Sequence, residues 1–410
     1  MVKLSHRIGV FGVAVATALG LTACADNGSE ADTTHASASE TASAQSGTSQ
    51  TRAADGAVTV TDAAGRTLQF NELPERIVLA EGRAAFATAL LQDEPLHNVV
   101  AYGQDLEKAA GAFRDKLFEL QPEAKDMPTI GMIQKGDVTV ENLLAQKPDV
   151  VIMTLDQKKA VEESGFLSDM DAAGLKYAFI DFRQKPLENT TVSMQLLGDL
   201  LGQSERAEKY NEFYNAKVKE ITDRVAETTD RPDVLIWMAA GFNDCCAVAG
   251  DANLGTLVTA AGGHNLGPEV LGADSTTITA EKLIELNPDK LIVTGGEWAR
   301  DPNRTDAVRH VELGYQSSPE LALQTCDGPL SQAGMDQLDA TKTGNYFAVY
   351  HQFYDNPYNV FALEAFAKWM HPEQFADLNP TQDFKDFHKE WLPFEYSGAF
   401  FIDPANPEES

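Results

Sequence analysis

The sequence predicts an α/β protein made of two similar lobes that are joined by one long helix. Short apolar runs alternate with helical patterns in both halves of the chain, which is typical of parallel sheets covered by helices. A stretch of purely helical periodicity separates the halves, and one sequence unit occurs once in each of them. The chain has 410 residues, 43% of them hydrophobic, so it is long enough for two cores of this kind.

Acidic residues dominate the charge of the chain. Asp and Glu number 62 against 32 for Lys and Arg, which gives a formal net charge of −30. Nucleic acids and anionic membrane surfaces repel such a protein, so general nucleic-acid binding is excluded. The four cysteines are too few for a small disulfide scaffold, and the eight histidines form no run that would indicate a metal tract.

The first 23 residues have the order of an export signal. Lys3 and Arg7 precede the apolar segment 8–20, which is shorter than the roughly 20 residues that span a bilayer. Small residues then lead to Cys24. This order resembles a bacterial lipoprotein signal peptide over residues 1–23, which implies cleavage before Cys24 and acyl chains such as palmitate on its sulfur. The alternative is an uncleaved apolar N-terminus that carries a cysteine by chance.

Residues 24–56 are predicted to be the lipidated cysteine and a tether. After Cys24 the stretch consists mostly of Ala, Ser, Thr, Gly and acids, so it cannot form a core and we expect it to be disordered. Two or three acyl chains hold a protein firmly at a membrane. We therefore expect an extracytoplasmic protein that is lipid-anchored to the cell membrane and not embedded in it.

The first lobe is predicted over residues 57–188. It opens with a hairpin whose strands flank the turn residues 62–65. Four apolar runs follow as candidate strands, with helical patterns between them, and this alternation favours a parallel sheet. The runs are residues 77–80, 99–102, 150–154 and 177–180.

Residues 189–230 are predicted to be connecting helices. Four leucines between 196 and 201 lie on one apolar helical face. A second helical pattern then continues until Arg231-Pro232 stops it. This second helix has about 23 residues and would be roughly 35 Å long, enough to cross from one lobe to the other.

The second lobe is predicted over residues 231–402, followed by a short tail at 403–410. Its candidate strands and helices alternate as in the first lobe. The strands are residues 234–239, 291–294 and 347–350, and the helices are 254–261, 280–286, 360–370 and 384–391.

One sequence unit occurs in both lobes, 140 residues apart. In the first lobe it begins at Thr139, continues with Glu141 and ends in Pro148-Asp149, and the same residue types recur at 279, 281, 288 and 289. The unit reads as a helix capped by Thr, a Pro that ends it, and a buried strand. Its Glu lies in the first turn, where the helix dipole favours an acid. The recurrence indicates two lobes of similar topology.

Several short motifs, in this order, resemble substrate-binding lipoproteins of bacterial ABC importers for ferric siderophores, haem and cobalamin. This is the periplasmic-binding-protein class with a single helix between its lobes. The motifs are Thr59-Val60-Thr61-Asp62 with Gly65-Arg66, Pro74-Glu75-Arg76-Ile77-Val78, Pro148-Asp149, Glu205-Arg206-Ala207, Ala261-Gly262-Gly263 and Pro288-Asp289. The resemblance covers residues 58 to about 402, and the stretches 81–83 and 350–359 resemble the members that handle iron complexes.

The resemblance implies two Rossmann-like lobes with a ligand cleft between them. It implies a monomeric binding protein, not an enzyme, that captures a ferric chelate (a siderophore) and delivers it to an ABC permease and its ATPase. The iron complex is then the cargo, and no cofactor is implied. Glu141 and Glu281 match by position the one surface Glu per lobe that docks on Arg residues of the permease. The alternative is that they only stabilise the starts of their helices.

Ligands of open α/β lobes bind outside the carboxyl ends of the strands, and this rule selects the candidate ligand-binding residues. They are Arg83 and Tyr102 in the first lobe and Trp298, Arg300, Tyr350, His351 and Tyr354 in the second. The guanidinium of Arg83 is a candidate partner for an anionic chelate, and Trp298 for stacking on a chelator ring. The alternative role for these side chains is packing or, for Arg83, a salt bridge at the surface or between the lobes. Phe242 is a weaker candidate, and direct ligation of the metal by protein atoms stays open.

Three cysteines remain besides Cys24, namely Cys245, Cys246 and Cys326. Outside the cytoplasm we expect one disulfide from Cys326 to one of the two neighbours, which leaves one thiol. A bridge between the neighbours is the alternative.

Other functions stay open at this point. Haem would use a Tyr or His as axial ligand, which residues 350, 351 and 354 supply, and cobalamin belongs to the same class of importers. An extracytoplasmic enzyme is disfavoured because the sequence contains no G-x-S-x-G, H-E-x-x-H, P-loop or G-x-G-x-x-G motif. A surface adhesin would need an exposed apolar patch, which the sequence does not obviously supply.

Overall fold

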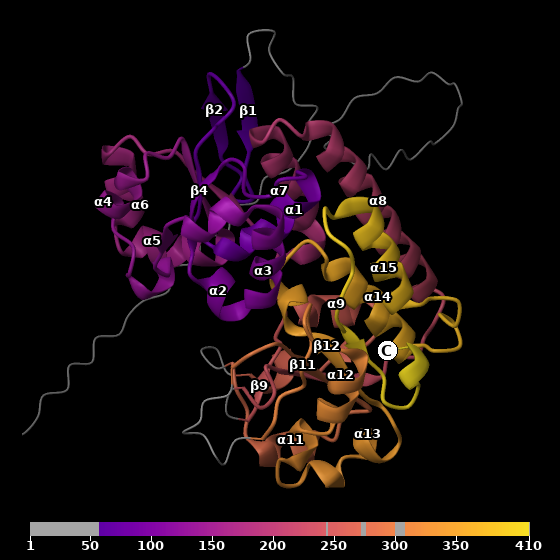
Figure 1. The fold of residues 1–410 in the computed structure, drawn as a ribbon. Helices are drawn as coiled ribbons and strands as arrows, with labels where there is room; N and C mark the ends of the chain where they lie inside the picture. Colours follow the sequence, from indigo (N-terminus) through magenta and orange to yellow (C-terminus); the bar gives the residue numbers. More distant parts are fainter. Residues whose placement is uncertain (1–56, 243–244, 272–275, 300–307, 410) are drawn as a thin grey trace, which may run out of the picture. The chain divides into compact units, whose positions relative to one another are not determined.

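The structure is a computed structural model, and it describes residues 57–242, 245–271, 276–299 and 308–409 (Figure 1). By its internal contacts the chain divides into residues 1–49 and a compact unit of residues 50–410, and only the second unit is described below. The expected signal peptide, Cys24 and the tether up to residue 56 lie outside the described residues. No helix in the described part is both long and apolar enough to cross a bilayer.

The first lobe is built on a five-stranded parallel sheet with the strand order β5-β4-β3-β6-β7. Its strands are β3 (Ile77–Leu79), β4 (Val99–Gly103), β5 (Thr129–Ile130), β6 (Val150–Thr154) and β7 (Tyr177–Ile180). An antiparallel hairpin of β1 (Val58–Thr61) and β2 (Thr67–Phe70) precedes the sheet. Asp62 forms the turn of this hairpin, because its carboxylate accepts the backbone N–H groups of Ala64 and Arg66.

Helices cover both faces of this sheet. Successive strand residues point to opposite sides, and residues on both sides are buried in apolar clusters. Val78 and Val151 belong to one apolar cluster, whereas Leu79 and Ile152 belong to the other. The helices of this lobe are α1 (Ala85–Leu91), α2 (Asp105–Ala109), α3 (Gly111–Leu120), α4 (Val140–Ala145), α5 (Lys158–Glu163) and α6 (Phe166–Ala172).

Two helices, α7 (Pro186–Leu200) and α8 (Ser204–Val225), lead from the first sheet to the second. With 22 residues, α8 is roughly 33 Å long. It is anchored on the second lobe, where the Tyr214 hydroxyl donates to Asn359 Oδ1 at 2.8 Å. Lys217 adds ion pairs to Glu364 (2.9 Å) and Asp383 (2.6 Å). The single long connecting helix is therefore present.

The second lobe is built on a mixed sheet with the strand order β10-β8-β11-β12-β13. The central strands β8 (Asp233–Met238), β11 (Lys290–Gly295) and β12 (Tyr346–Tyr350) are parallel, and so is the short β10 (His264–Asn265). Two short antiparallel strands complete the sheet, with β13 (Phe401–Ile402) on β12 and β9 (Ala247–Val248) on β8.

The helices of the second lobe pack around this sheet, and α14 (Asn359–Met370) is buried along almost its whole length. Most of its residues are apolar, and its buried Glu364 is the acid that pairs with Lys217. The other helices are α9 (Leu254–Ala260), α10 (Gly267–Val270), α11 (Ala280–Leu286), α12 (Pro319–Cys326), α13 (Asp339–Lys342) and α15 (Pro380–Trp391). Two helix-covered α/β sheets joined by a long helix confirm the predicted fold class.

The repeated sequence unit has the same structure in both lobes. The hydroxyls of Thr139 and Thr279 cap α4 and α11, each by accepting the backbone N–H three residues on (3.2 and 3.1 Å). Both helices are followed by a residue in the left-handed conformation, with φ of 49° at Lys147 and 41° at Asn287.

The aspartates that end the two units also correspond. Asp149 accepts backbone N–H groups at the start of β3, and Asp289 accepts the N–H of Asp233 at the start of β8. The Pro-Asp motif therefore joins each helix to the neighbouring strand, and its role is structural.

Candidate functional site

Charged side chains follow almost every parallel strand of the first lobe at its carboxyl end. They meet a segment of the second lobe that follows β12, as expected for open α/β sheets. We call this group the ionic cluster, and its members are Glu81 and Arg83 after β3, Asp105 after β4, Asp156 after β6, Arg183 after β7, and Gln352, Tyr354 and Asp355 after β12.

Arg83 lies at the centre of the ionic cluster and is almost completely buried. Its guanidinium pairs with Glu81 and with Asp105 at 3.3 Å within the first lobe. Across to the second lobe it donates to Tyr354 Oη at 2.5 Å and pairs with Asp355 at 3.1 Å. The salt bridge between lobes that was the alternative role of Arg83 is therefore formed.

Arg183 makes the second set of contacts between the lobes. One guanidinium nitrogen, Nη1, pairs with Asp156 at 2.5 Å, whereas Nη2 pairs with Asp355 and donates to Tyr354 Oη at 3.2 Å. Both guanidiniums also lie over the Tyr354 ring, at 4.8 Å for Arg183 and 5.2 Å for Arg83. Tyr354 is thus held by cation–π contacts and hydrogen bonds together.

The acids of the ionic cluster respond differently to their burial. Burial raises the pKa of Asp105 and Asp355 to about 7, and the charge of Glu81 adds to this shift. For Glu81 burial acts in the same direction, but Arg83 and Arg183 outweigh it, so its pKa is lowered. The arginines therefore outweigh the effect of burial on the pKa of Glu81, but they do not outweigh it for the two aspartates.

Aromatic rings of the second lobe lie beside the ionic cluster. Trp298 contacts the rings of Phe242, His351 and His310 at centroid distances of 4.8, 5.1 and 5.4 Å, and His351 lies 4.7 Å from Tyr354. We call these five residues the aromatic group. Phe242 is 42% exposed whereas Trp298 and His310 are buried, so the apolar surface that this group presents to solvent is mainly the Phe242 ring.

His351 is neutral at physiological pH. Its Nδ1 is 2.7 Å from the hydroxyl of Thr294, which in turn accepts the backbone N–H of Ala239. Burial lowers the pKa of His351 to about 3, and the charges of Arg83 and Arg183 act in the same direction.

The structure brings together four of the seven ligand-binding candidates, namely Arg83, Trp298, His351 and Tyr354. Tyr102 and Tyr350 instead lie in the apolar core, each 3% exposed. The ring of Tyr350 packs against Phe353 and Phe400. Both side chains therefore have the alternative role, which is packing in the core. Arg300 lies outside the described residues.

Sequence reasoning missed the acids of the ionic cluster, and with them Arg183 and Gln352. The strand-end rule that selected Arg83 also selects Asp105, Asp156 and Arg183, because each follows a predicted strand of the first lobe by a few residues. That signal was available, whereas the pairing of Arg183 with Asp355 depends on the packing of the two lobes.

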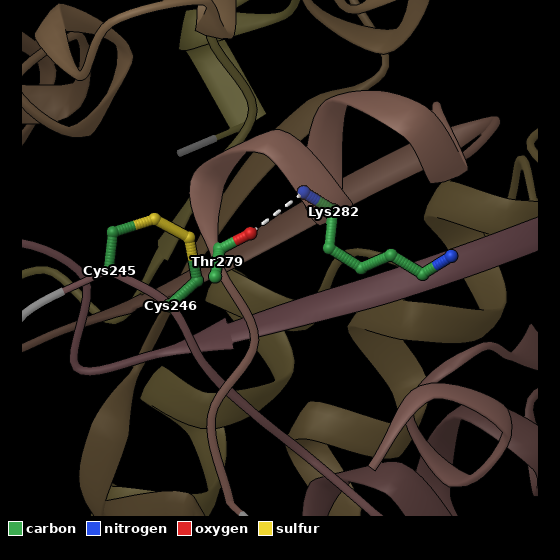
Figure 2. The surroundings of a disulfide bond; sticks show 4 residues. All are labelled: Cys245, Cys246, Thr279 and Lys282. Carbon is green, nitrogen blue, oxygen red and sulfur yellow. Dashed lines mark hydrogen bonds between the residues drawn. A yellow bond between two sulfur atoms is a disulfide. The ribbon is translucent and has the colours of Figure 1, made fainter.

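The cysteine prediction is corrected by the structure. Cys245 and Cys246 form a disulfide with each other, and Cys326 is a free, buried thiol, so the expected bridge to Cys326 is wrong. Cys326 ends α12 in the core, where its carbonyl accepts the Tyr346 hydroxyl at 2.7 Å. Burial raises the pKa of its thiol to about 12. Figure 2 shows the disulfide beside the first turn of α11, near Thr279.

The two glutamates proposed for docking occupy equivalent places. Glu141 and Glu281 are both exposed in the first turns of α4 and α11. The pKa of each is lowered by hydrogen bonds to its own backbone N–H and to the capping threonine. Among the described residues no group of three or more His, Cys, Asp or Glu is arranged to hold a metal ion.

Comparisons with known proteins agree with this fold. The structure of the TroA-like periplasmic binding protein FepB from Veillonella parvula is similar, with a TM-score of 0.74 and 25% identity over 84% of this chain and 99% of that chain. The molybdate-binding protein MolA of Haemophilus influenzae shares the fold, with a TM-score of 0.61 and 17% identity over 83% of this chain and 99% of that one.

Two matches are at the level of sequence. The uncharacterized ABC transporter substrate-binding lipoprotein YvrC of Bacillus subtilis is 19% identical over 289 residues, which are 68% of this chain and 84% of that protein. The family model described as periplasmic binding protein matches residues 108–313, half of the chain. The chain therefore belongs to the periplasmic binding protein family, a family of solute-binding proteins.

Proposed function

We propose that this protein is the substrate-binding lipoprotein of an ABC importer and that its solute is a ferric chelate, a siderophore complex. The observation that carries the proposal is the position of the candidate site. Strand ends of both lobes contribute to one group of polar and aromatic side chains, as a protein that holds a solute between two lobes requires. The similarity to a substrate-binding lipoprotein of an ABC transporter supports the importer role.

The chemistry of the site suits an organic chelate better than a bare ion. The exposed ring of Phe242, which packs on the buried Trp298, offers flat apolar surface for the ligand framework of a chelate. The Tyr354 hydroxyl, which accepts hydrogen bonds from Arg83 and Arg183, can donate its own O–H at the edge of this surface. Side chains of this kind bind the outside of a complex whose iron is already coordinated.

Delivery is proposed to follow from two further features of the chain. Acyl chains on Cys24 would keep the protein extracytoplasmic and at the cell membrane. Glu141 and Glu281, one on each lobe, would place the loaded protein on the permease through two equivalent ion pairs, and the ATPase would then drive transport.

Equilibrium dialysis of the full-length protein in detergent tests the proposed solute. Separate cells contain iron-55 complexes of a trihydroxamate, a tris-catecholate and citrate, and parallel cells contain hemin or cobalamin. We expect at least one ferric chelate to bind with a Kd of about 1 μM or tighter. Tight binding of hemin or cobalamin alone, or of none of these compounds, contradicts the proposal.

A matched pair of variants tests whether the aromatic group is the binding surface. Phe242 and Leu144 are exposed to the same degree, at 42% and 43%, so truncating either has little effect on folding. Phe242→Ala should weaken binding of the chelate by about tenfold, whereas Leu144→Ala on α4 should leave it unchanged. Equal affinities of the two variants would place the solute elsewhere.

Haem is the second candidate, and the neutral imidazole of His351 is the observation that favours it, since an axial ligand must be unprotonated. The hemin arm of the dialysis decides between the two. A shifted Soret band that disappears in His351→Ala would support haem.

A further inference from the structure

The ionic cluster contains more acid than base. Two guanidiniums, Arg83 and Arg183, face four carboxylates, which leaves a formal charge of −2 when all are ionised. All of these groups are largely removed from water, with side-chain exposures from 2% at Asp355 to 19% at Asp156. The segment 300–307, outside the described residues, contains two arginines and two aspartates, so its own formal charge is zero.

The arginines have little capacity left for an anion. In Arg83 every guanidinium nitrogen already has a carboxylate, amide or hydroxyl partner. In Arg183 the two terminal nitrogens are paired with Asp156, Asp355 and Tyr354, and only the buried Nε has no partner. An anionic chelate would have to displace carboxylates from these donors, and it would leave buried acids unpaired.

The same cluster has fewer positive groups than its carboxylates could pair with. One carboxylate oxygen, Oδ1 of Asp156, is buried without a hydrogen-bond partner at the edge of the cluster. The pKa values of Asp105 and Asp355 are raised to about 7, chiefly by burial and further by the charge of Glu81, which agrees with a site where acids outnumber bases. In the adjoining aromatic group, burial lowers the pKa of His351 to about 3, so this imidazole adds no charge.

We infer that the solute carries no net negative charge, so that it belongs to the neutral or cationic ferric chelates, such as ferric trihydroxamates, and not to the trianionic tris-catecholates. This inference rests on the proposed function and narrows its substrate class. It reverses the role expected for Arg83 from the sequence: the guanidinium neutralises acids of the protein and joins the lobes instead of binding an anion.

Equilibrium dialysis with three iron-55 complexes of graded charge tests the inference on the full-length protein at pH 7.5. The probes are a cationic ferric trihydroxamate, a neutral ferric trihydroxamate and a trianionic ferric tris-catecholate. We expect the first two to bind about tenfold or more tightly than the third. If the trianion binds as tightly or more tightly, the inference is wrong and the proposed function stands. If none of the three binds, the inference is wrong, and the proposed function is wrong as well unless ferric citrate binds in the dialysis described above.

A pair of variants tests whether the preference for the charge of the solute arises from the ionic cluster. Asp156→Asn removes one negative charge at the partly exposed edge, and it should weaken binding of the cationic complex and strengthen that of the trianion, each by about tenfold. Asp93→Asn removes the same charge from an exposed surface site and should change neither affinity. The same charge preference in both variants as in the wild type would contradict the assignment.

Discussion

At the scale of single residues, burial decides which protonation state the protein uses. His388 in α15 is fully buried, and its Nδ1–H donates to the Phe384 carbonyl at 2.8 Å. Nε2 is then left to accept the Tyr315 hydroxyl at 3.2 Å. Only the neutral imidazole makes both bonds, and burial lowers its pKa to about 4, with the charge of Lys116 acting in the same direction.

His388 should therefore destabilise the fold in acid. Between pH 6.5 and 4 the unfolded chain protonates this imidazole while the folded chain does not, so the free energy of unfolding falls as the pH falls. From pH 7 to 4.5, His388→Gln should lose about 2 kcal/mol less stability than the wild type, measured by urea denaturation. The exposed His97→Gln serves as control and should behave like the wild type, and an equal acid loss in His388→Gln would disprove this account.

The candidate site shows what sequence can establish at this scale. Arg83 and Tyr354 were predictable because each follows an apolar run that had to be a strand. Their partnership was not predictable, because the two residues are 271 positions apart and meet only when the lobes pack. The pairing of the disulfide was not predictable either, because the sequence does not show that Cys326 is buried in the core.

At the scale of elements, the repeated unit makes the two lobes comparable. Thr139 and Thr279 each cap a short helix with one hydrogen bond to the backbone. Thr139→Ala and Thr279→Ala should each lower the free energy of unfolding by about 1 kcal/mol, whereas the Thr→Ser variants should retain most of it. Urea denaturation measures both pairs, and alanine variants as stable as the wild type would contradict the capping role.

The same two helices carry the proposed docking contacts. The double variant Glu141→Lys/Glu281→Lys should reduce iron uptake through the cognate importer by about tenfold or more, because it replaces two attractions with repulsions. Chelate binding by the purified protein should not change. Glu94→Lys, at another exposed acid, is the control. Unchanged uptake in the double variant would refute docking through these residues.

Elements with a clear apolar pattern were predictable, and the shortest strands were not. The buried strands β6 and β7 and the helix α11 have the predicted bounds, because apolar runs and helical spacing mark them. The two-residue strands β5, β9, β10 and β13 were not predicted. Two residues are too few to show alternation, and such strands form only where a neighbouring strand offers its edge.

At the scale of the whole molecule, two connections limit how far the lobes can move. One is α8, which is fixed to the second lobe by Tyr214 and Lys217. The other is the set of bonds that Arg83 and Arg183 make across the lobes. We expect the ferric chelate to change the radius of gyration in solution scattering only slightly, and a large decrease would show a hinged closure instead.

The central claim is that the solute binds between the lobes, at the ends of the strands. Hydrogen–deuterium exchange of the full-length protein, with and without the ferric complex that binds most tightly in dialysis, tests it directly. We expect slower exchange in residues 81–85 and 181–184 of the first lobe together with residues 351–356 of the second. Protection confined to one lobe, or to the surface around Gln203 and Arg206 at the start of α8, would contradict the claim.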